Sequence, residues 1–287
     1  MIFRTINYWL DALPAPPGGI SPALFYLPLF LIALFFLAGL VYKPFLLSFM
    51  PTQLRFQTVD ATQVPKLDRD SLQRLTQEFQ AAGFVPLGDI TNTAGIAAFN
   101  ASSPDDAANG QGTMNTTTAP LPAPTPAVDS ANYKIVPGFC RVFGHPQHGC
   151  YADLHQHFPP GGTPTPFSWS VSSEMEDGWD VTTSSRRPEA IFYLMRRPRG
   201  ARFTHQGMRP AELLQVHLAQ RSKLQNELGL NLLNKCDLQA YVAAERRVMM
   251  DSREVLKKKN PFAALWEVLR FMVAPKKEWS GERGVRA

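Results

Sequence analysis

GCYADLHQHF at residues 149–158 and FSWSVSSEM at 167–175 decide the fold class, because both stretches alternate apolar with polar side chains. Successive side chains of a β-strand point to opposite faces, so this period of two predicts two half-buried strands. We interpret the apolar face of the first strand as the core side: Cys150, Ala152, Leu154 and Phe158. The opposite face is expected to meet solvent: Tyr151, Asp153, His155 and His157.

The turn after the second strand follows from register. A two-residue loop at Asp177-Gly178 would mix the polar and apolar faces of the two strands that it joins. A three-residue loop ending in a left-handed Gly178 instead pairs Met175 with Trp179 and Ser173 with Val181, which keeps the apolar face together. We therefore predict the longer loop.

Two further strands are expected on either side of these. Phe84 to Ile90 follows an amphipathic helix with Asp68 or Asp70 as N-cap and Gly83 at its C-terminal end, and Pro86 favours an edge position for that strand. The run from Ala190 to Met195 is apolar throughout, so we predict a strand that is central or covered on both faces.

The C-terminal region is expected to be helical. Pro210 suits a first helical turn and Gly229 a left-handed end, and a second helix is predicted from Asp237 to Lys259. We expect these two helices to form an antiparallel hairpin that covers the sheet, with a coiled coil for a partner as the alternative. His217 lies on the apolar stripe of the first helix and is expected to be a hydrogen-bonded boundary residue.

An apolar segment near the N-terminus predicts a membrane anchor. Residues 23–42, ALFYLPLFLIALFFLAGLVY, carry no charge and would span roughly 30 Å as a helix, the thickness of a bilayer core. The long run and its context argue against a cleaved signal peptide. We therefore expect one transmembrane helix in contact with the lipid bilayer.

The predicted fold is α+β: an N-terminal transmembrane helix, then a mostly antiparallel sheet of about five strands packed with helices and a C-terminal helical hairpin. The stretch 100–131 is rich in Ser, Thr, Asn, Gly, Ala and Pro, so we interpret it as a disordered insertion. The expected boundaries are a tail at 1–22, the anchor at 23–42, a linker at 43–66, the α+β domain at 67–206, the helical region at 207–275 and a basic tail at 276–287.

Charge is unevenly distributed. From Arg196 onward the chain holds 19 basic and 9 acidic residues, which indicates either a solvated basic surface or contact with something anionic. The apolar helix expected at 262–273 lies between lysines, so an anionic lipid surface is a possible partner, with packing against the core as the alternative. No nucleic-acid module is evident, and nucleic-acid binding is not expected.

Three cysteines are too few for a disulfide framework, so free thiols are expected. Together with a small excess of positive charge on the C-terminal side of the anchor, they favour a cytoplasmic position for the soluble domain.

One cluster of side chains suggests metal chemistry. Imidazole, thiolate and carboxylate groups gather between Cys140 and His157, and these are ligands that zinc prefers. Strand alternation places Cys150 on the opposite face, which reduces the candidate zinc site to Asp153, His155 and His157. A plain polar strand surface is the alternative. No nucleotide-binding loop, nucleophile elbow or pair of catalytic carboxylates is evident.

Three segments carry a resemblance: LTQEFQAAGFVPLGD at 75–89, DGWDVTTSS at 177–185 and LLQVHLAQR at 213–221. Together they resemble a loosely defined group of bacterial membrane-anchored proteins. That group combines an amphipathic helix ending in Gly-Phe, a hairpin with Asp-Gly at its turn and a later helix with a histidine. The resemblance implies no activity.

The sequence thus favours a non-catalytic role, a single-pass membrane-tethered interaction or scaffold module. The alternative is a metal-dependent enzyme or sensor that uses His155 and His157.

Overall fold

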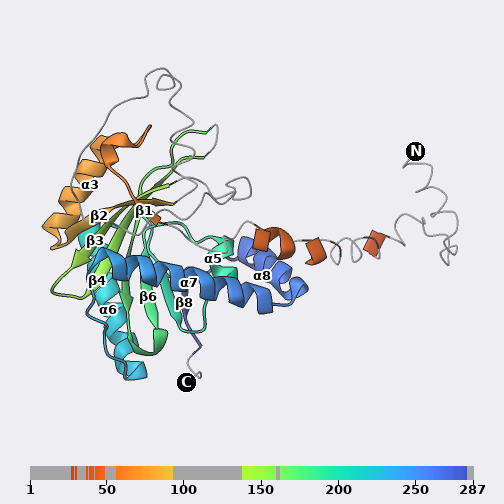
Figure 1. Cartoon of the computed structure of the whole chain (residues 1–287). Coiled ribbons are helices and arrows are strands. Elements are labelled where there is room, and N and C mark those ends of the chain that lie inside the picture. The colour runs from red at the N-terminus through yellow and green to blue at the C-terminus, as the bar shows by residue number, and fades with distance from the viewer. Residues whose placement is uncertain are drawn as a thin grey trace, which may run out of the picture.

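The computed structural model of the chain describes residues 27–28, 30, 37, 39–41, 43–48, 56–92, 138–159 and 162–282. Within them an eight-stranded sheet follows the sequence order from β1 to β8 (Figure 1). Neighbouring strands are antiparallel except β6 and β7, which are parallel. The strands are β1 (Phe56–Thr58), β2 (Val85–Asn92), β3 (Gly138–His145), β4 (Cys150–His157), β5 (Ser168–Glu174), β6 (Asp180–Ser184), β7 (Gly200–Thr204) and β8 (Glu278–Ser280).

The α+β class is confirmed in general terms, but the prediction of about five strands is too low. The strands that were not predicted, β1, β7 and β8, have three, five and three residues, so each gives little alternation to detect. Helices flank the sheet: η2 (Ala61–Gln63), α3 (Arg69–Ala81), η5 (Glu176–Gly178), α5 (Ala190–Leu194), α6 (Pro210–Leu228), α7 (Leu238–Lys258) and α8 (Pro261–Val273).

The strand predicted at Ala190 to Met195 is wrong, because this run forms the short helix α5. A short, wholly apolar run is compatible with either a buried strand or a buried helix, and periodicity cannot separate them. The topology explains the outcome, since a connection between parallel strands must cross over the sheet. Here α5 lies in the crossover from β6 to β7, and its Leu194 is fully buried.

The predicted helical hairpin is also wrong. Leu213 and Leu214 of α6 join a core with α3 and one face of the sheet. Tyr241 of α7 packs against the other face, beside Tyr151 and Val142. Helix α7 therefore crosses the sheet opposite α3 and α6, and the molecule has three layers (Figure 1). An amphipathic pattern shows that a helix has a buried side but not which face of a sheet it covers.

Several helix ends and one turn follow the local sequence signals. Asp68 caps α3 by accepting a hydrogen bond from the Ser71 amide, and Gly229 ends α6 in the left-handed conformation. The three-residue turn is confirmed: Gly178 has φ of 71°, the Met175 amide donates to the Trp179 carbonyl at 2.8 Å, and Ser173 lies opposite Val181.

The expectation that one face of β4 meets solvent is wrong. Tyr151 is 3% exposed and Asp153 is 5% exposed, because α7 covers this face. Cys150, Ala152 and Leu154 on the other face are wholly buried with α3 and α6, as predicted. Strand β4 is thus covered on both sides, and the polar residues of its second face line an internal space.

No described helix is long and apolar enough to cross a membrane. The prediction of a transmembrane helix at 23–42 is therefore overturned, although most of that segment lies outside the described residues. A long uncharged run is the sequence signal of a spanning helix, but the signal alone does not establish one. The insertion predicted at 100–131 also lies outside the described residues.

The helical residues 43–48 are held against the start of α8. Lys43 donates to the carbonyls of Lys257 and Lys259 at 2.5 and 2.7 Å, at the C-terminal end of α7. Leu46 and Leu47 pack against Leu256 and the neighbouring part of α8. This segment, which the sequence suggested to be a linker, is thus part of the folded body.

Candidate functional site

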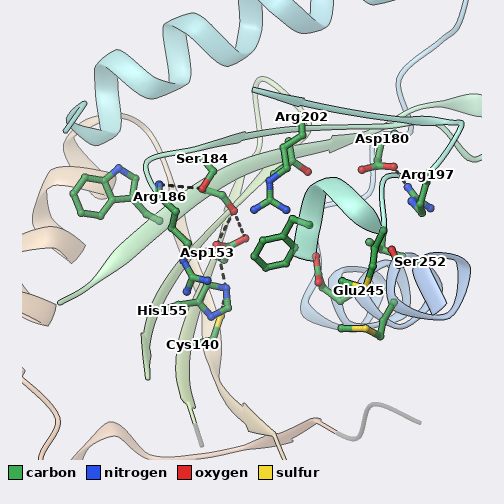
Figure 2. Close-up of a pocket in the computed structure, with 18 of the residues that line it drawn as sticks. Cys140, Asp153, His155, Asp180, Ser184, Arg186, Arg197, Arg202, Glu245 and Ser252 are labelled. Carbon is green, nitrogen blue, oxygen red and sulfur yellow. Dashed lines mark hydrogen bonds and ion pairs between the residues drawn. The ribbon is translucent and has the colours of Figure 1, made fainter. Parts of the chain in front are cut away.

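A cavity of about 350 Å³ lies between the sheet and the helices α5 and α7. Its floor is the face of β3 to β7 that carries Asp153, and its cover includes Glu245, Val248, Met249 and Ser252 of α7. Figure 2 shows charged side chains from the strands and from α7 directed toward the same space. A cavity of this size suits a small molecule.

Cys140, His155 and Asp153 form a connected polar group on the floor. Cys140 lies opposite His155 in the antiparallel register of β3 and β4. The Nε2 atom of His155 is 3.7 Å from the Cys140 sulfur and 3.1 Å from Oδ1 of Asp153. Ser170 donates to Asp153 at 2.8 Å, and the Tyr241 hydroxyl lies 3.4 Å from the same carboxylate.

The charge states of this group follow from burial and contact. Burial favours the neutral form of Asp153, but His155 and the hydrogen bonds from His155 and Ser170 outweigh it and keep the pKa of this carboxyl below its usual value. Burial likewise opposes protonation of His155, yet Cys140 and Asp153 beside it raise its pKa. Burial raises the pKa of the Cys140 thiol. At neutral pH the group is therefore a thiol beside an imidazolium–carboxylate pair.

These three residues do not form a nucleophilic triad. Such a triad needs the base to contact the nucleophile through one ring nitrogen and the orienting carboxylate through the other. In this protein both Cys140 and Asp153 approach Nε2 of His155. Cys140 is also 5% exposed and its thiol is not activated. The arrangement therefore does not support cysteine catalysis.

His157 is held by Arg186 instead. The Nη2 atom of Arg186 donates to Nε2 of His157 at 2.7 Å, and its Nε donates to the Ser168 hydroxyl at 2.6 Å. Burial, followed by the charges of Arg186 and His155, lowers the pKa of His157 to about 4. His157 is therefore neutral, and the lone pair on its Nε2 atom accepts the hydrogen bond from Arg186.

The three predicted zinc ligands share one face but are engaged with other groups. The rings of His155 and His157 lie parallel with centroids 6.2 Å apart, and their Nε2 atoms contact Asp153 and Arg186 respectively. Within the described part of the chain, no three His, Cys, Asp or Glu side chains are arranged to hold a metal ion. Zinc binding at Asp153, His155 and His157 stays a prediction.

Two arginines in the cavity form no ion pair with a carboxylate in the part of the chain that the structure describes. Arg186 bonds only to neutral groups, and Arg202 stacks over the Phe192 ring, with Cζ 4.3 Å from the ring centroid. Neither guanidinium takes part in an ion pair among the described residues. Burial, followed by the charge of Arg186, lowers the pKa of Arg202, and the carboxylates of Asp153, Glu245 and Glu189 oppose this shift from a distance without forming an ion pair.

The other two arginines at this site serve the framework. Arg197 is 7% exposed and pairs with Asp180 of β6 and with Asp251 of α7, the latter at 2.8 Å. Arg196 pairs with Glu267 of α8 at 2.8 Å. Their charges are therefore compensated, and they fasten α7 and α8 to the crossover.

Glu245 completes the charged lining from the α7 side (Figure 2). Burial, with Asp153 as the next cause, raises the pKa of Glu245 to about 7, against the opposing effect of His155, Arg202 and Arg197. A protonated carboxyl can donate a hydrogen bond. Near neutral pH this residue is therefore only partly ionised, and part of its population can donate a hydrogen bond into the cavity.

Much of the remaining wall is apolar. It combines aromatic and aliphatic side chains from the strands, from α5 and from α7: Phe56, Ile90, Trp169, Phe192, Met195, Val248, Met249 and Trp279. The cavity thus has a cationic region at Arg186 and Arg202 and an apolar region beside it.

Part of this site is predictable from the sequence, because Asp153, His155 and His157 all line the cavity. Arg202 and Glu245 were not predicted, since they reach the site only through the parallel β6–β7 pairing and the placement of α7. Arg186 was also not predicted; it lies just after β6 and reaches the site through the antiparallel pairing of β4, β5 and β6. The meeting of Cys140 and His155 could have been found from register, since both lie five residues from the ends of the β3–β4 turn.

Comparison of the chain with models of protein families, with curated proteins and with solved structures finds no match to any of the three.

Proposed function

We propose that this protein is a non-catalytic binding module whose cavity holds a small molecule with one anionic group, a carboxylate or phosphate, attached to an apolar body. The observation that carries the proposal is the pair of arginines, Arg186 and Arg202, in one cavity without a carboxylate partner among the described residues. A buried charge without a partner is costly, and an anionic ligand would offset that cost.

The two arginines suit an anion in different ways. Arg186 is fixed by the Ser168 hydroxyl and by His157, so one edge of its guanidinium is oriented in advance. Arg202 is supported on its flat face by Phe192, which leaves its N–H groups free to donate in the plane. Pre-oriented donors reduce the entropic cost of binding.

The apolar wall argues for an amphipathic ligand over a bare ion. A small inorganic anion would fill only part of about 350 Å³. Trp169, Phe192 and Met249 line the same cavity and would be left against water. An aliphatic or aromatic body of several carbons buries this surface and adds to affinity.

Octanoate is a suitable probe, with 1-octanol as the neutral analogue of equal chain length. We expect the unfolding temperature of the full-length protein to rise with the logarithm of the octanoate concentration once that concentration exceeds the dissociation constant, and 1-octanol to have a much smaller effect. Arg202→Met removes the charge and keeps an apolar stem. We expect it to weaken octanoate binding by about 2 kcal/mol, roughly 30-fold, measured by calorimetric titration.

Arg74→Met is the matched control, because Arg74 is exposed on α3, on the opposite side of the sheet. It should bind octanoate like the unchanged protein. Equal stabilisation by octanoate and 1-octanol, or equal octanoate affinity in both methionine variants, would contradict the proposal.

A further inference from the structure

Helix α8 buries only one side. Ala264 and Phe271 are 0% and 6% exposed, and Phe271 packs with its ring centroid 5.3 Å from that of Tyr193 on α5. Ala264 joins Leu194 and Leu256 in a small core. This side fixes the helix to the body of the protein.

The other side of α8 is apolar and exposed. Trp266 is 60% exposed, Leu269 41%, Met272 71% and Val273 87%. Positions 266, 269 and 273 recur at helical spacing, so they form one stripe. Four large apolar side chains on one short helix are more than the scattered single residues of an ordinary surface.

The N-terminal helical residues extend this apolar surface. A Cβ at Gly39 would lie 2.6 Å from the Phe262 ring, so this segment crosses α8 at its first turn. Leu37, Leu40 and Val41 are each 58–60% exposed beside that crossing. Figure 1 shows the N-terminal helical segment, in red-orange, next to α8 and away from the sheet.

Positive charge surrounds the stripe. Between residues 257 and 277 the chain has six basic residues and one acidic residue, Glu267. Glu267 is already paired with Arg196 and Lys259. Five basic side chains are exposed around α8: Lys257, Lys258, Arg270, Lys276 and Lys277. Of these, Lys257 pairs with Glu254 of α7 at 2.5 Å.

We propose that α8 docks in the plane of an anionic lipid surface, with its apolar stripe inserted among the acyl chains and the flanking lysines on the headgroups. The combination of an exposed apolar stripe with a surrounding cationic border matches such a surface in both respects. At 13 residues α8 is about 20 Å long, which suits in-plane contact. The cavity proposed above is on the sheet side and does not enter this argument.

The test uses the full-length protein and flotation with vesicles of phosphatidylcholine containing 30% phosphatidylserine, beside vesicles of phosphatidylcholine alone. We expect the anionic vesicles to bind at least tenfold more protein, and 0.5 M NaCl to release most of it. Trp266→Glu combined with Met272→Glu should reduce the bound fraction at least tenfold.

Val85→Glu is the matched control, since Val85 is 51% exposed and belongs to β2, a strand that lies away from α8 (Figure 1). It should float like the unchanged protein, and all variants should unfold at the same temperature. Binding that is unchanged in the double variant, or equal on neutral vesicles, overturns the proposal. The proposal is also overturned if the unchanged protein binds no vesicles but self-associates, and the double variant abolishes that self-association. A second copy of the chain would then cover α8.

Discussion

The guanidinium of Arg202 lies flat over the ring of Phe192, with Cζ 4.3 Å from the ring centroid. Arg202 comes from β7, and Phe192 comes from α5 in the crossover that precedes it. The same crossover that makes β6 and β7 parallel thus supplies the support for the cationic part of the cavity. Stacking holds the charge in place without neutralising it, so the N–H groups stay available to a ligand.

This contact predicts a measurable effect of Phe192→Leu. Leucine keeps the site apolar but removes the aromatic face, which contributes about 0.5–2 kcal/mol to a cation held above it. We expect octanoate binding to weaken by about threefold to tenfold in a calorimetric titration. Phe192→Tyr retains a ring and should bind nearly as the unchanged protein does. Equal weakening in both variants would show that the ring is not the cause.

His217 predicts a dependence of stability on pH. It is fully buried, with Nε2 2.8 Å from the Ser173 hydroxyl and Nδ1 3.1 Å from the Thr183 hydroxyl. Burial, followed by the charge of Arg221, lowers its pKa from 6.5 to about 3. Between about pH 3 and pH 6.5, His217 is therefore protonated in the unfolded chain and neutral in the folded protein. Its contribution to stability is complete above pH 6.5 and is lost as the pH falls toward 3.

We expect the free energy of unfolding to fall by about 1.4 kcal/mol between pH 7.5 and pH 5.5. The reason is that each pH unit below the pKa of His217 in the unfolded chain costs about this amount while the folded form stays neutral. Urea unfolding of the unchanged protein and of His217→Gln at both pH values measures it. Glutamine does not titrate, so the advantage of the unchanged protein should narrow by about this amount at pH 5.5. A constant difference between the two proteins would refute this role of His217.

Gly83 and Gly229 form a natural pair for testing backbone strain. Both have positive φ, at 91° and 67°, after the helices α3 and α6. A Cβ at Gly83 would lie 2.8 Å from Nε2 of His145, whereas one at Gly229 meets nothing within 4 Å. Gly229→Ala should cost about 1 kcal/mol for conformation alone. Gly83→Ala should cost about 1–3 kcal/mol more, because His145 must move.

Chemical unfolding of the two alanine variants gives this difference directly. A similar loss of unfolding free energy in both variants would mean that the His145 side chain moves aside at little energetic cost.

Arg141 should be sensitive to the shape of its head group. Its Nε and Nη2 each donate to Asp89 at 2.7 Å, and Nη1 donates to the Thr76 hydroxyl at 3.0 Å, which joins β2, β3 and α3. Lysine keeps the charge but cannot make this forked contact. We expect Arg141→Lys to lose about 1–2 kcal/mol of unfolding free energy. Arg74→Lys, at an exposed position on α3, should change it little.

The zinc prediction has its own test. Binding by Asp153, His155 and His157 would require His157 to leave Arg186 and His155 to turn from Asp153. Because both contacts must break, we expect elemental analysis of the purified protein to give well below one equivalent of zinc. One equivalent that disappears in His155→Ala with His157→Ala would establish the metal site instead.

Local chemistry made several features predictable from sequence. The Asp68 cap, the Gly229 helix end and the Glu176–Gly178 turn each depend on a few neighbouring residues, so their signals are complete within a short window. The core face of β4 was predictable for the same reason. The polar face of β4 was misread because a strand pattern cannot distinguish solvent from a covered cavity.

The remaining errors concern contacts between distant segments. Nothing within 190–195 reveals that this run must cross from β6 to a parallel β7, and nothing within 237–259 shows which face of the sheet that helix covers. Arg202 and Glu245 reach one cavity only after both placements are made. The β4 residues of the candidate site were therefore predictable from the sequence. The arginines that supply its unpaired charge were not.

The pairing of β8 with β7 has a consequence for the order of assembly. Strands β3 to β6 each pair with a strand that is close in sequence, so these pairs can form early in folding with little loss of chain entropy. Glu278 of β8 instead pairs with Phe203, and the loop between them contains α6, α7 and α8. During synthesis on a ribosome, β8 can pair with the edge of β7 only after all three helices have emerged. Strand β8 therefore joins a sheet whose other strands can already be paired.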